Sequence, residues 1–413
     1  MAELYRLPRL QPWGWRSQGA PLPAFRRALG ADLDQGLVYL LGAQHEVLAL
    51  DLQTARVRPP VATGVREAAI GPDGTLFTVS DSLAVVALVR RNPVRLQGRL
   101  PGPPRDLFGT KESDALAITA GRSNQFYALH ADAPAARMEL PPGDAAATFW
   151  GDLVAIAADT AVILVDPSDP GGPMAMPVTG HARAVLFSPS GHRLYVARRE
   201  GPILVFNRYS GEQIGDIELP RPASALRADP WGRWLLVHPG GADSVWLVDG
   251  ARGRLVAGFA TAWASDVPTV TNQGILLVKQ RADLVAYDLN DPAMPETGRV
   301  PGGAADLWLP LAWTPETGTA STSLEPEAPA IPADQAEATL ARVFLQVSSS
   351  QNRAWSGELA RQLAEAGLPA QVLDPRPGEE GFRVVLGPYP SREAAESVGR
   401  KLGRPFFIYQ PDR

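Results

Sequence analysis

Short apolar runs separated by turn residues set the pattern of this chain between residues 180 and 220. Residues 184–188, 193–197, 203–207 and 213–219 each have the length and alternation of a β-strand, and Pro189-Ser190-Gly191 is one of the turn signals between them. The pattern predicts a four-stranded antiparallel meander. Such a sheet cannot bury both of its faces alone, so it must pack against similar sheets.

The same unit recurs between residues 25 and 314. The residue that ends the third strand of each unit serves as a marker, and successive markers are 36 to 42 residues apart. The markers are Asp51, Val89, His130, Asp166, Asn207, Asp249 and Asp288. Chance apolar runs would not keep this spacing, so the sequence predicts a repeat architecture with seven units.

The repeated unit resembles a blade of a WD-like or YVTN-like β-propeller. The resemblance lies in Gly180-His181 before the first strand and in Phe187-Ser188-Pro189-Ser190-Gly191 at the first turn, whereas Phe206-Asn207 stands where the WD family has Trp-Asp. We therefore expect a mainly β fold, with a seven-bladed β-propeller over residues 25–314.

Two further segments belong to this prediction. Residues 1–24, rich in Pro and Arg, are expected to form an N-terminal strap on the propeller. One surplus apolar run, residues 305–313, has no outer strands after it. It predicts that the ring closes when this run pairs with N-terminal strands around residues 37–60.

Composition narrows the classes of function. The chain of 413 residues has a net charge of −5, which gives no reason to expect a nucleic-acid partner. It has no cysteine, so disulfides and thiolate metal sites are excluded. No apolar run approaches the ~18 residues that a membrane span needs, and residues 1–30 lack the apolar core of a secretory signal. We expect either a cytoplasmic protein or the processed form of an exported one.

The composition changes after the propeller. Residues 315–339 are rich in Pro, Glu, Ala, Ser and Thr and offer almost nothing to bury, which predicts a linker. Beyond it the pattern predicts strands at residues 343–347, 370–373, 382–386 and 406–409, and helices at residues 353–366 and 391–402. This β-α-β-β-α-β order predicts a small α+β domain over residues 340–413, with helices on one face of an open sheet.

This second domain resembles the SPOR domain, the sporulation-related repeat of bacterial envelope proteins. Phe344-Leu345-Gln346-Val347 carries the resemblance in the first strand, as does the run from Phe382 to Tyr389 followed by Ser391-Arg392-Glu393. Members of that family bind peptidoglycan, prefer glycan strands stripped of stem peptides, and concentrate at division septa. The resemblance implies the same partner here. The family's first strand usually continues into Gly, a small residue and Phe, whereas this chain has Ser348-Ser349-Ser350, so weaker binding is expected.

Strand alternation predicts which side chains of this domain could meet a sugar. Leu345, Val347, Phe382, Val384 and Leu386 should pack on the helices. The opposite face should then offer an amide, a hydroxyl, a guanidinium and an aromatic ring, which are groups that hydrogen-bond to a glycan or stack on it. The predicted peptidoglycan-binding residues are Phe344, Gln346, Ser348, Arg383, Val385 and Tyr389. The alternative is that this face is merely a solvated sheet surface.

The predicted propeller has weaker candidates for chemistry. The aspartates Asp51, Asp166, Asp249 and Asp288 could be metal ligands, but aspartate after a strand usually caps the turn through its own backbone. The five histidines lack metal-ligand spacing, and His181 is expected to be a structural hydrogen-bonding group, with His192 solvated. Catalytic motifs such as a nucleophile elbow are missing. Trp231 and Trp263, near strand ends, are candidates for a binding rim.

These observations predict a non-catalytic bacterial cell-envelope protein, periplasmic in location, that uses no cofactor and no metal. Its second domain would bind peptidoglycan glycan strands, and its propeller would bind another envelope or divisome protein. Two alternatives stay open. One is a propeller enzyme of the lactonase or glycan-hydrolase type with a site in the central channel. The other is a cytoplasmic WD-like scaffold whose second domain has lost glycan binding.

Overall fold

The computed structural model divides the chain into two compact units, Met1–Leu311 and Ala312–Arg413. The structure describes residues 1–313, apart from residues 20, 34, 90–91, 111, 121–123, 170, 231 and 312. In the second unit it describes residues 343–350, 353–365, 368–375, 382–390, 395, 398 and 407–409. The predicted linker, Trp231 and most of the predicted second helix therefore lie outside the described residues.

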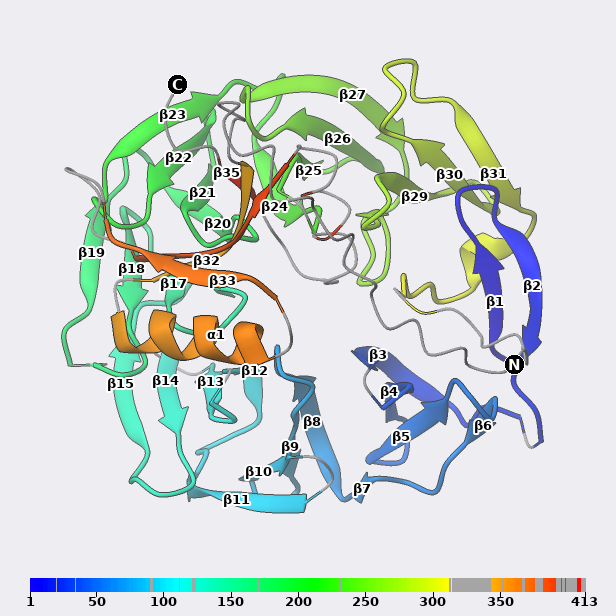
Figure 1. Ribbon diagram of the computed structural model, residues 1–413, viewed down its shortest axis with the longest axis horizontal. Helices are drawn as coiled ribbons and strands as arrows, with labels where there is room; N and C mark the ends of the chain where they lie inside the picture. The colour runs from blue at the N-terminus through cyan, green and yellow to red at the C-terminus, as the bar shows by residue number, and fades with distance from the viewer. Residues whose placement is uncertain are drawn as a thin grey trace, which may run out of the picture. The chain divides into compact units, whose positions relative to one another are not determined.

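The first unit is a ring of seven antiparallel sheets, called blades 1 to 7 in chain order (Figure 1). Within each blade the first strand lies nearest the centre of the ring and the last strand lies at its periphery (Figure 1). Blades 2 to 7 each consist of four consecutive strands. The arrangement confirms the predicted seven-bladed β-propeller.

The strands follow one another around the ring in sequence order. Blade 1 consists of β3 (Phe25–Asp32), β4 (Leu37–Gly42), β5 (Glu46–Asp51), β6 (Arg56–Val57) and β7 (Ala62–Thr63). Blade 2 consists of β8 (Val65–Ile70), β9 (Leu76–Ser80), β10 (Ala84–Val89) and β11 (Asn92–Arg99). Blade 3 consists of β12 (Pro104–Gly109), β13 (Ala115–Thr119), β14 (Asn124–Leu129) and β15 (Ala136–Leu140). Blade 4 consists of β16 (Ala145–Ala147), β17 (Val154–Ala157), β18 (Ala161–Val165) and β19 (Met174–Pro177).

The last three blades follow the same order. Blade 5 consists of β20 (Ala182–Phe187), β21 (Arg193–Arg198), β22 (Ile203–Asn207) and β23 (Gln213–Ile217). Blade 6 consists of β24 (Ala223–Ala228), β25 (Trp234–Pro239), β26 (Ser244–Asp249) and β27 (Arg254–Ala260). Blade 7 consists of β28 (Thr269–Val270), β29 (Ile275–Gln280), β30 (Asp283–Asp288) and β31 (Glu296–Val300). Every predicted marker ends the third strand of its blade or directly follows it.

Burial explains why the middle strands read as continuous apolar runs. Every residue of β4 and β5 is buried, whereas exposed and half-buried residues alternate along the outer strand β27. A middle strand is covered by a neighbouring blade on each face, so both sets of its side chains must be apolar. The outer strand β27 lies at the rim, where only every second residue is half-buried.

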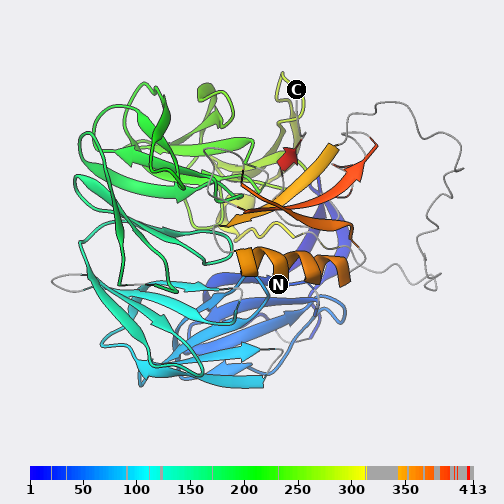
Figure 2. The ribbon, with the colours of Figure 1, turned by 60° about the vertical axis from the view of Figure 1, so that its left-hand side comes forward.

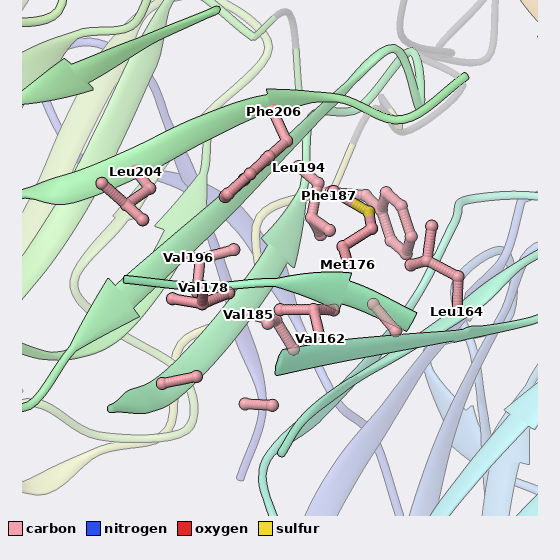
Figure 3. Packing of buried hydrophobic residues seen from close by; sticks show 13 residues of the cluster. Val162, Leu164, Met176, Val178, Val185, Phe187, Leu194, Val196, Leu204 and Phe206 are labelled. Carbon is pink, nitrogen blue, oxygen red and sulfur yellow. The ribbon is translucent and has the colours of Figure 1, made fainter. Parts of the chain in front are cut away.

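Neighbouring blades pack face to face through these apolar side chains. Between blades 4 and 5, Leu164 and Met176 on one side meet Phe187, Leu194 and Phe206 on the other (Figure 3). Each of these five is at most 4% exposed. Burial of one such side chain contributes roughly 1.5–3 kcal/mol, so each blade is stabilised mainly by its neighbours.

The turns after the third strands repeat as well. Asp51 Oδ1 accepts the backbone N–H groups of Gln53 and Thr54, both at 2.9 Å, and Asp249 Oδ1 accepts those of Ala251 and Arg252, both at 3.0 Å. Three other residues at the marker position make the same kind of turn: Asp166, Asn207 and Asp288. This geometry confirms that the repeated aspartates cap turns.

The predicted closure of the ring is wrong. Gly303–Ala305 form a 3₁₀ turn (η1), and residues 306–311 belong to no sheet. The first strand of blade 1 is β3, which pairs with β4 from Phe25↔Gly42 to Asp32↔Leu37. Two register shifts interrupt this pairing, so β3 lacks the regular alternation by which a strand is recognised in a sequence.

An N-terminal hairpin joins the last blade to the first. It consists of β1 (Glu3–Arg6) and β2 (Gln11–Arg16), which pair with each other alone among the described strands. On blade 7, Thr297 Oγ1 donates to the carbonyl of Pro8 at 2.9 Å, and Leu10 is buried in the apolar cluster of that sheet. On the side of blade 1, Trp15 Nε1 donates to the carbonyl of Leu52 at 2.8 Å. The hairpin therefore bridges the two ends of the ring.

A half-buried ion pair between Asp266 and Lys279 holds the chain after blade 7. Asp266 Oδ2 accepts Lys279 Nζ at 2.8 Å and the backbone N–H of Trp308 at 3.0 Å. Burial opposes the ionisation of Asp266, but these donors and the N–H of Val267 outweigh it and hold the pKa of its carboxyl below the usual value.

We expect the substitution Asp266→Asn to destabilise the propeller by about 2 kcal/mol at pH 7, because it removes charge-assisted hydrogen bonds from a half-buried cation. A depressed carboxyl pKa contributes stability that is present above the unfolded-state value, about 3.9, and is lost as the pH falls through the lower folded-state value. The difference between wild type and variant should therefore shrink below about pH 4. Urea unfolding at pH 7 and at pH 3 measures it, and a difference independent of pH would contradict the assignment.

The second unit is a four-stranded antiparallel sheet with one described helix. Its elements are β32 (Val343–Ser350), α1 (Arg353–Glu365), β33 (Ala370–Leu373), β34 (Phe382–Tyr389) and β35 (Phe407–Tyr409), in the sheet order β33-β34-β32-β35. α1 lies against one side of this sheet and contacts β32, β33 and β34 (Figure 2). Among the helix side chains that the structure describes, the buried ones are Ser356, Ala360 and Leu363, which share one helix face at spacings of four and three. The side chains of Trp355 and Leu359 lie outside the described set.

Candidate functional site

The register of the second sheet decides which predicted site residues share a face. Phe344 pairs with Tyr409, and Gln346 pairs with Val385, while Arg383 lies two residues before Val385 on β34. Residues that pair directly, and residues two apart on one strand, lie on the same face of a sheet. We call Phe344, Gln346, Arg383, Val385 and Tyr409 the Arg383 face.

The opposite face is apolar throughout its centre. Leu345 pairs with both Leu386 and Ile408, and Val372 pairs with Val384. Leu345, Val384 and Leu386 are fully buried. An all-apolar face of this kind is the one that a helix covers, as the alternation of the sequence predicts.

The Arg383 face is less exposed than its outward direction predicts. Arg383 and Gln346 are each 6% exposed, Phe344 is 7% exposed and Val385 is fully buried. Tyr409 supplies part of the cover, because its ring centroid lies 5.0 Å from the Arg383 guanidinium carbon and 6.2 Å from the ring centroid of Phe344. The face that strand alternation predicts to be open is instead a compact cluster in which a cation lies over an aromatic ring, and the alternative of a solvated sheet surface does not fit this burial.

Tyr409 is one of two residues of the Arg383 face that the sequence did not predict. The sequence predicted the strand that carries Tyr409. The pairing of Tyr409 with Phe344 could not be predicted, because it depends on β35 lying next to β32, and these two strands are far apart in the chain. Gln371 was also missed. It pairs with Val385, so it shares the Arg383 face, and it is exposed at the β33 edge.

A β-bulge changes the position of the serines. The pairing of β32 with β34 shifts between Gln346 and Ser348, so that Ser348 pairs with Val384 and Ser349 pairs with Arg383. Simple alternation had placed Ser348 in the same row as Gln346. The register thus puts Ser349, rather than Ser348, in line with Arg383.

Tyr389 ends β34 opposite Val343, beside Gly387. Burial raises the pKa of its phenol, and its hydroxyl is buried with no hydrogen-bond partner among the described residues. A Cβ atom on Gly387 would stand 3.1 Å from Phe344 Cδ1 and 3.2 Å from Tyr389 Cδ2. A glycine is therefore what allows these two aromatic rings to approach the same point of the sheet.

In the propeller, polar side chains near the centre of the ring form hydrogen bonds between successive blades. Asp144 Oδ2 accepts the Val185 N–H of blade 5 at 3.1 Å, and burial raises the pKa of this carboxyl. Arg27 donates to Glu67 and to the carbonyl of Ala68 in blade 2. These donors and acceptors lie about one repeat apart in the sequence, as expected for ties between equivalent strands.

The histidines take part in local contacts. His181 Nδ1 lies 2.9 Å from Asp159 Oδ1, and His130 Nδ1 lies 2.7 Å from Asp114 Oδ2. The first pair confirms that His181 is a hydrogen-bonding group. His192 was expected to be solvated, but it is half-buried, with its ring 5.8 Å from that of Tyr209.

Trp263, a candidate for a binding rim, lies in a stacked arrangement. Its ring is 5.4 Å from that of His238 at an interplanar angle of 19°, and the Arg227 guanidinium carbon lies 4.8 Å from its centroid. Burial lowers the pKa of Arg227, which also donates to the carbonyls of Ala264 and Pro268. These contacts account for Trp263 as a packing residue between blades 6 and 7.

Among the described residues, no three His, Asp or Glu side chains are grouped so that they could hold a metal ion. No helix in the part of the chain that the structure describes is long and apolar enough to cross a membrane.

The ring of seven sheets defines the first unit as a β-propeller, and solved structures share this fold. Dihydro-heme d1 dehydrogenase NirN, in complex with DHE, matches with a TM-score of 0.50 at 15% identity, over 71% of this chain and 69% of that chain. The Cps50 (Swd1) β-propeller domain of Myceliophteria thermophila matches with a TM-score of 0.44 at 12% identity, over 66% and 96%. Hydrazine synthase of Kuenenia stuttgartiensis matches with a TM-score of 0.44 at 15% identity, over 69% and 98%. At these identities the likeness concerns the fold alone.

The second unit can be assigned to a family. Residues 340–409 match the SPOR domain family, so the chain carries a SPOR domain after its propeller. The expected resemblance is confirmed over the same part of the chain. Comparison with curated protein sequences gave no match.

Proposed function

We propose that this protein is a non-catalytic component of the bacterial cell envelope that binds peptidoglycan glycan strands through its SPOR domain. We also propose that it acts in the periplasm at the division septum, with the propeller as a platform for another envelope protein. The match of residues 340–409 to the SPOR family carries the proposal, because peptidoglycan binding is what that family suggests.

The chemistry of the Arg383 face supports a glycan ligand. Tyr409, which is half-buried, offers an aromatic ring for the apolar side of a sugar, and the exposed Gln371 offers an amide for its hydroxyl and acetamido groups. Phe344 and Gln346 belong to the buried part of the same face, where a sugar would meet them only at their edges. Phe344, Gln346, Ser348, Arg383, Val385 and Tyr389 remain the proposed binding residues. Tyr409 and Gln371 are added to this set because the strand register places them on the same face.

Arg383 supports a preference for stripped strands. Hydrolysis of the amide bond between glycan and stem peptide leaves a carboxylate on each stripped sugar. A guanidinium binds a carboxylate through two parallel hydrogen bonds, and it does so best where water is excluded. Arg383 is 6% exposed and stacked on Tyr409, so the cluster holds its guanidinium in place on this face.

We expect the full-length protein to sediment with amidase-treated sacculi more than with untreated sacculi. Arg383→Ala should weaken this binding about tenfold, which corresponds to roughly 1.4 kcal/mol, because a charge-assisted contact is lost. Binding should also decrease with added salt, since the contact is ionic. Sedimentation over a series of protein concentrations gives the affinity.

Arg353→Ala is the matched control. It also removes one arginine from the SPOR domain, but Arg353 is 74% exposed on α1, where it pairs with Asp374 at 3.7 Å. This variant should bind as wild type does. Because Arg383 is buried, a second test uses the exposed residue Gln371: Gln371→Ala should keep the unfolding temperature of the domain and bind less. Equal sedimentation with treated and untreated sacculi, or equal losses in the two arginine variants, would refute the proposal.

The two proposed functions divide between the two compact units. The boundary between Leu311 and Ala312 lies close to the start of the Pro- and Ala-rich segment that we propose as the linker, residues 315–339. We accordingly propose residues 25–314 as the propeller domain and residues 340–413 as the glycan-binding domain, with residues 1–24 as the strap that carries the N-terminal hairpin.

A further inference from the structure

The outer strand of blade 7 shows how this propeller holds a main-chain turn from another part of its own chain. In β31 the pairing with β30 shifts between Glu296 and Gly298, which leaves Thr297 as a bulge. Thr297 Oγ1 donates to the carbonyl of Pro8, and a Cβ atom on Gly298 would stand only 2.4 Å from the carbonyl carbon of Arg9. The bulge and the glycine together admit the turn of the N-terminal hairpin.

The same bulge recurs in blades 5 and 6. In blade 5, Val205 pairs with Gly215 and Phe206 with Gln213, so Ile214 is the extra residue of β23. In blade 6, Leu247 pairs with Ala257 and Val248 with Leu255, so Val256 is the extra residue of β27. Gly215 and Ala257 are therefore the structural equivalents of Gly298.

No contact or backbone angle within blade 5 requires a glycine at position 215. Its φ is not among the positive values that favour glycine, and no described heavy atom lies within 4 Å of the point where a Cβ would stand. A glycine inside a strand costs about 0.5–1 kcal/mol, so open space alone does not account for it. The neighbouring bulge residue, Ile214, is 53% exposed, which is unusual for isoleucine.

The equivalent position of blade 6 lacks the free space found around Gly215. Ala257 and Phe259 of β27 pack against the apolar cluster shared by blades 6 and 7. The bulge residue Val256 is also less exposed, at 36%. Blade 5 alone among these three thus combines the bulge, the glycine and an uncovered apolar side chain in the described chain.

The charge around Gly215 points to the kind of segment that fits. Glu212, Asp216 and Glu218 are exposed beside it, and none of them forms a salt bridge within the described residues. The segment held at blade 7 is Arg6-Leu7-Pro8-Arg9-Leu10, which combines arginines with leucines and a proline. A segment of that composition would match both the acidic residues and the exposed isoleucine of β23.

We propose that the edge of β23 around Ile214 and Gly215 binds a basic, proline-containing turn of a partner protein, in the way that β31 holds the hairpin turn at residues 6–10 of this chain. The backbone of the partner would lie over Gly215, its apolar side chains against Ile214, and its arginines near Glu212 and Asp216. This inference rests on the proposed role of the propeller as an interaction platform, and it names the surface and the chemistry of the partner.

A labelled peptide of residues 3–16 serves as the probe, and fluorescence anisotropy with the full-length protein measures its binding. We expect saturable binding at one site. Gly215→Val should weaken it at least tenfold, because the valine side chain fills the space over which the backbone would lie. The double variant Glu212→Gln and Asp216→Asn should weaken it as well, and more so at low salt, where charges act over longer distances. The control Ala257→Val, at the equivalent position of blade 6, should bind the peptide as wild type does.

The outcomes separate this inference from the proposed function. If the peptide does not bind, the inference is wrong. It is also wrong if the peptide binds equally to the wild type and to Gly215→Val, because the peptide would then be replacing the protein's own hairpin at blade 7. Gly215→Val should still sediment with amidase-treated sacculi, because the SPOR domain is unchanged. If the wild-type protein itself does not sediment with amidase-treated sacculi, the glycan-binding proposal is wrong instead.

Discussion

Replacing Gly298 by valine is expected to destabilise the propeller by about 3 kcal/mol, because the new side chain meets the main chain of Arg9 and displaces the N-terminal hairpin. Displacing the hairpin exposes Leu10, which is 5% exposed in the structure. It also removes the edge-on contact between the rings of Tyr5 and Trp308, whose centroids are 5.3 Å apart. Loss of one buried leucine contact alone costs about 2–5 kcal/mol in other proteins. Chemical denaturation followed by tryptophan fluorescence measures the change.

Gly215→Val is the matched control for this prediction. It makes the same substitution at the equivalent position of blade 5, where a Cβ meets no described atom within 4 Å. Its stability should equal that of the wild type or slightly exceed it, since valine favours a strand and glycine does not. Limited proteolysis adds a second readout: residues 1–18 should be cleaved faster in Gly298→Val. Equal stability of the two variants would show that the hairpin does not hold the ring together.

Replacing Gly387 by valine should unfold the SPOR domain and abolish its binding to sacculi. Gly387 has a φ of 127°, which side chains rarely adopt, and its Cβ would meet both Phe344 and the carbonyl of Val343 at 3.1 Å. Backbone strain and overpacking together cost roughly 2–5 kcal/mol. A domain of about 70 residues has only about 3–5 kcal/mol of stability, so a loss of this size leaves little of it folded.

Gly357→Ala provides a control of opposite sign. Gly357 lies within α1, where a Cβ meets no described atom, and alanine stabilises a helix interior over glycine by about 1 kcal/mol. This variant should raise the unfolding temperature of the SPOR domain and leave its sedimentation with sacculi unchanged. A Gly387→Val protein that unfolds at the wild-type temperature would contradict the role assigned to this glycine, whatever its binding.

The propeller could be predicted from the sequence because its repeat is local. Each blade is built from consecutive strands, and apolar runs and turn residues such as Pro189-Ser190-Gly191 recur at a nearly constant distance. The aspartates at the ends of the third strands bond to backbone two and three residues ahead. Interactions of such short range leave a direct trace in the order of the residues.

The closure of the ring left no such trace. Thr297 and Pro8 are 289 residues apart, and β3 escaped recognition because two register shifts break its alternation. An apolar run at residues 305–313 looked like a strand, yet Trp308 uses its indole N–H to donate to the carbonyl of Gly303 at 2.6 Å within a turn. Apolar character predicts burial, but it does not distinguish a strand from a packed loop.

In the SPOR domain the sequence by itself determined the family, the order of the described elements and most residues of the candidate face, because alternation along β32 and β34 depends only on neighbouring residues. The tertiary structure alone decided three things: the bulge that brings Ser349 into line with Arg383, the position of Tyr409 over that guanidinium, and the burial of the face. Each depends on which strands lie side by side, and pairing between distant segments is set by the packing of the whole sheet rather than by any local pattern.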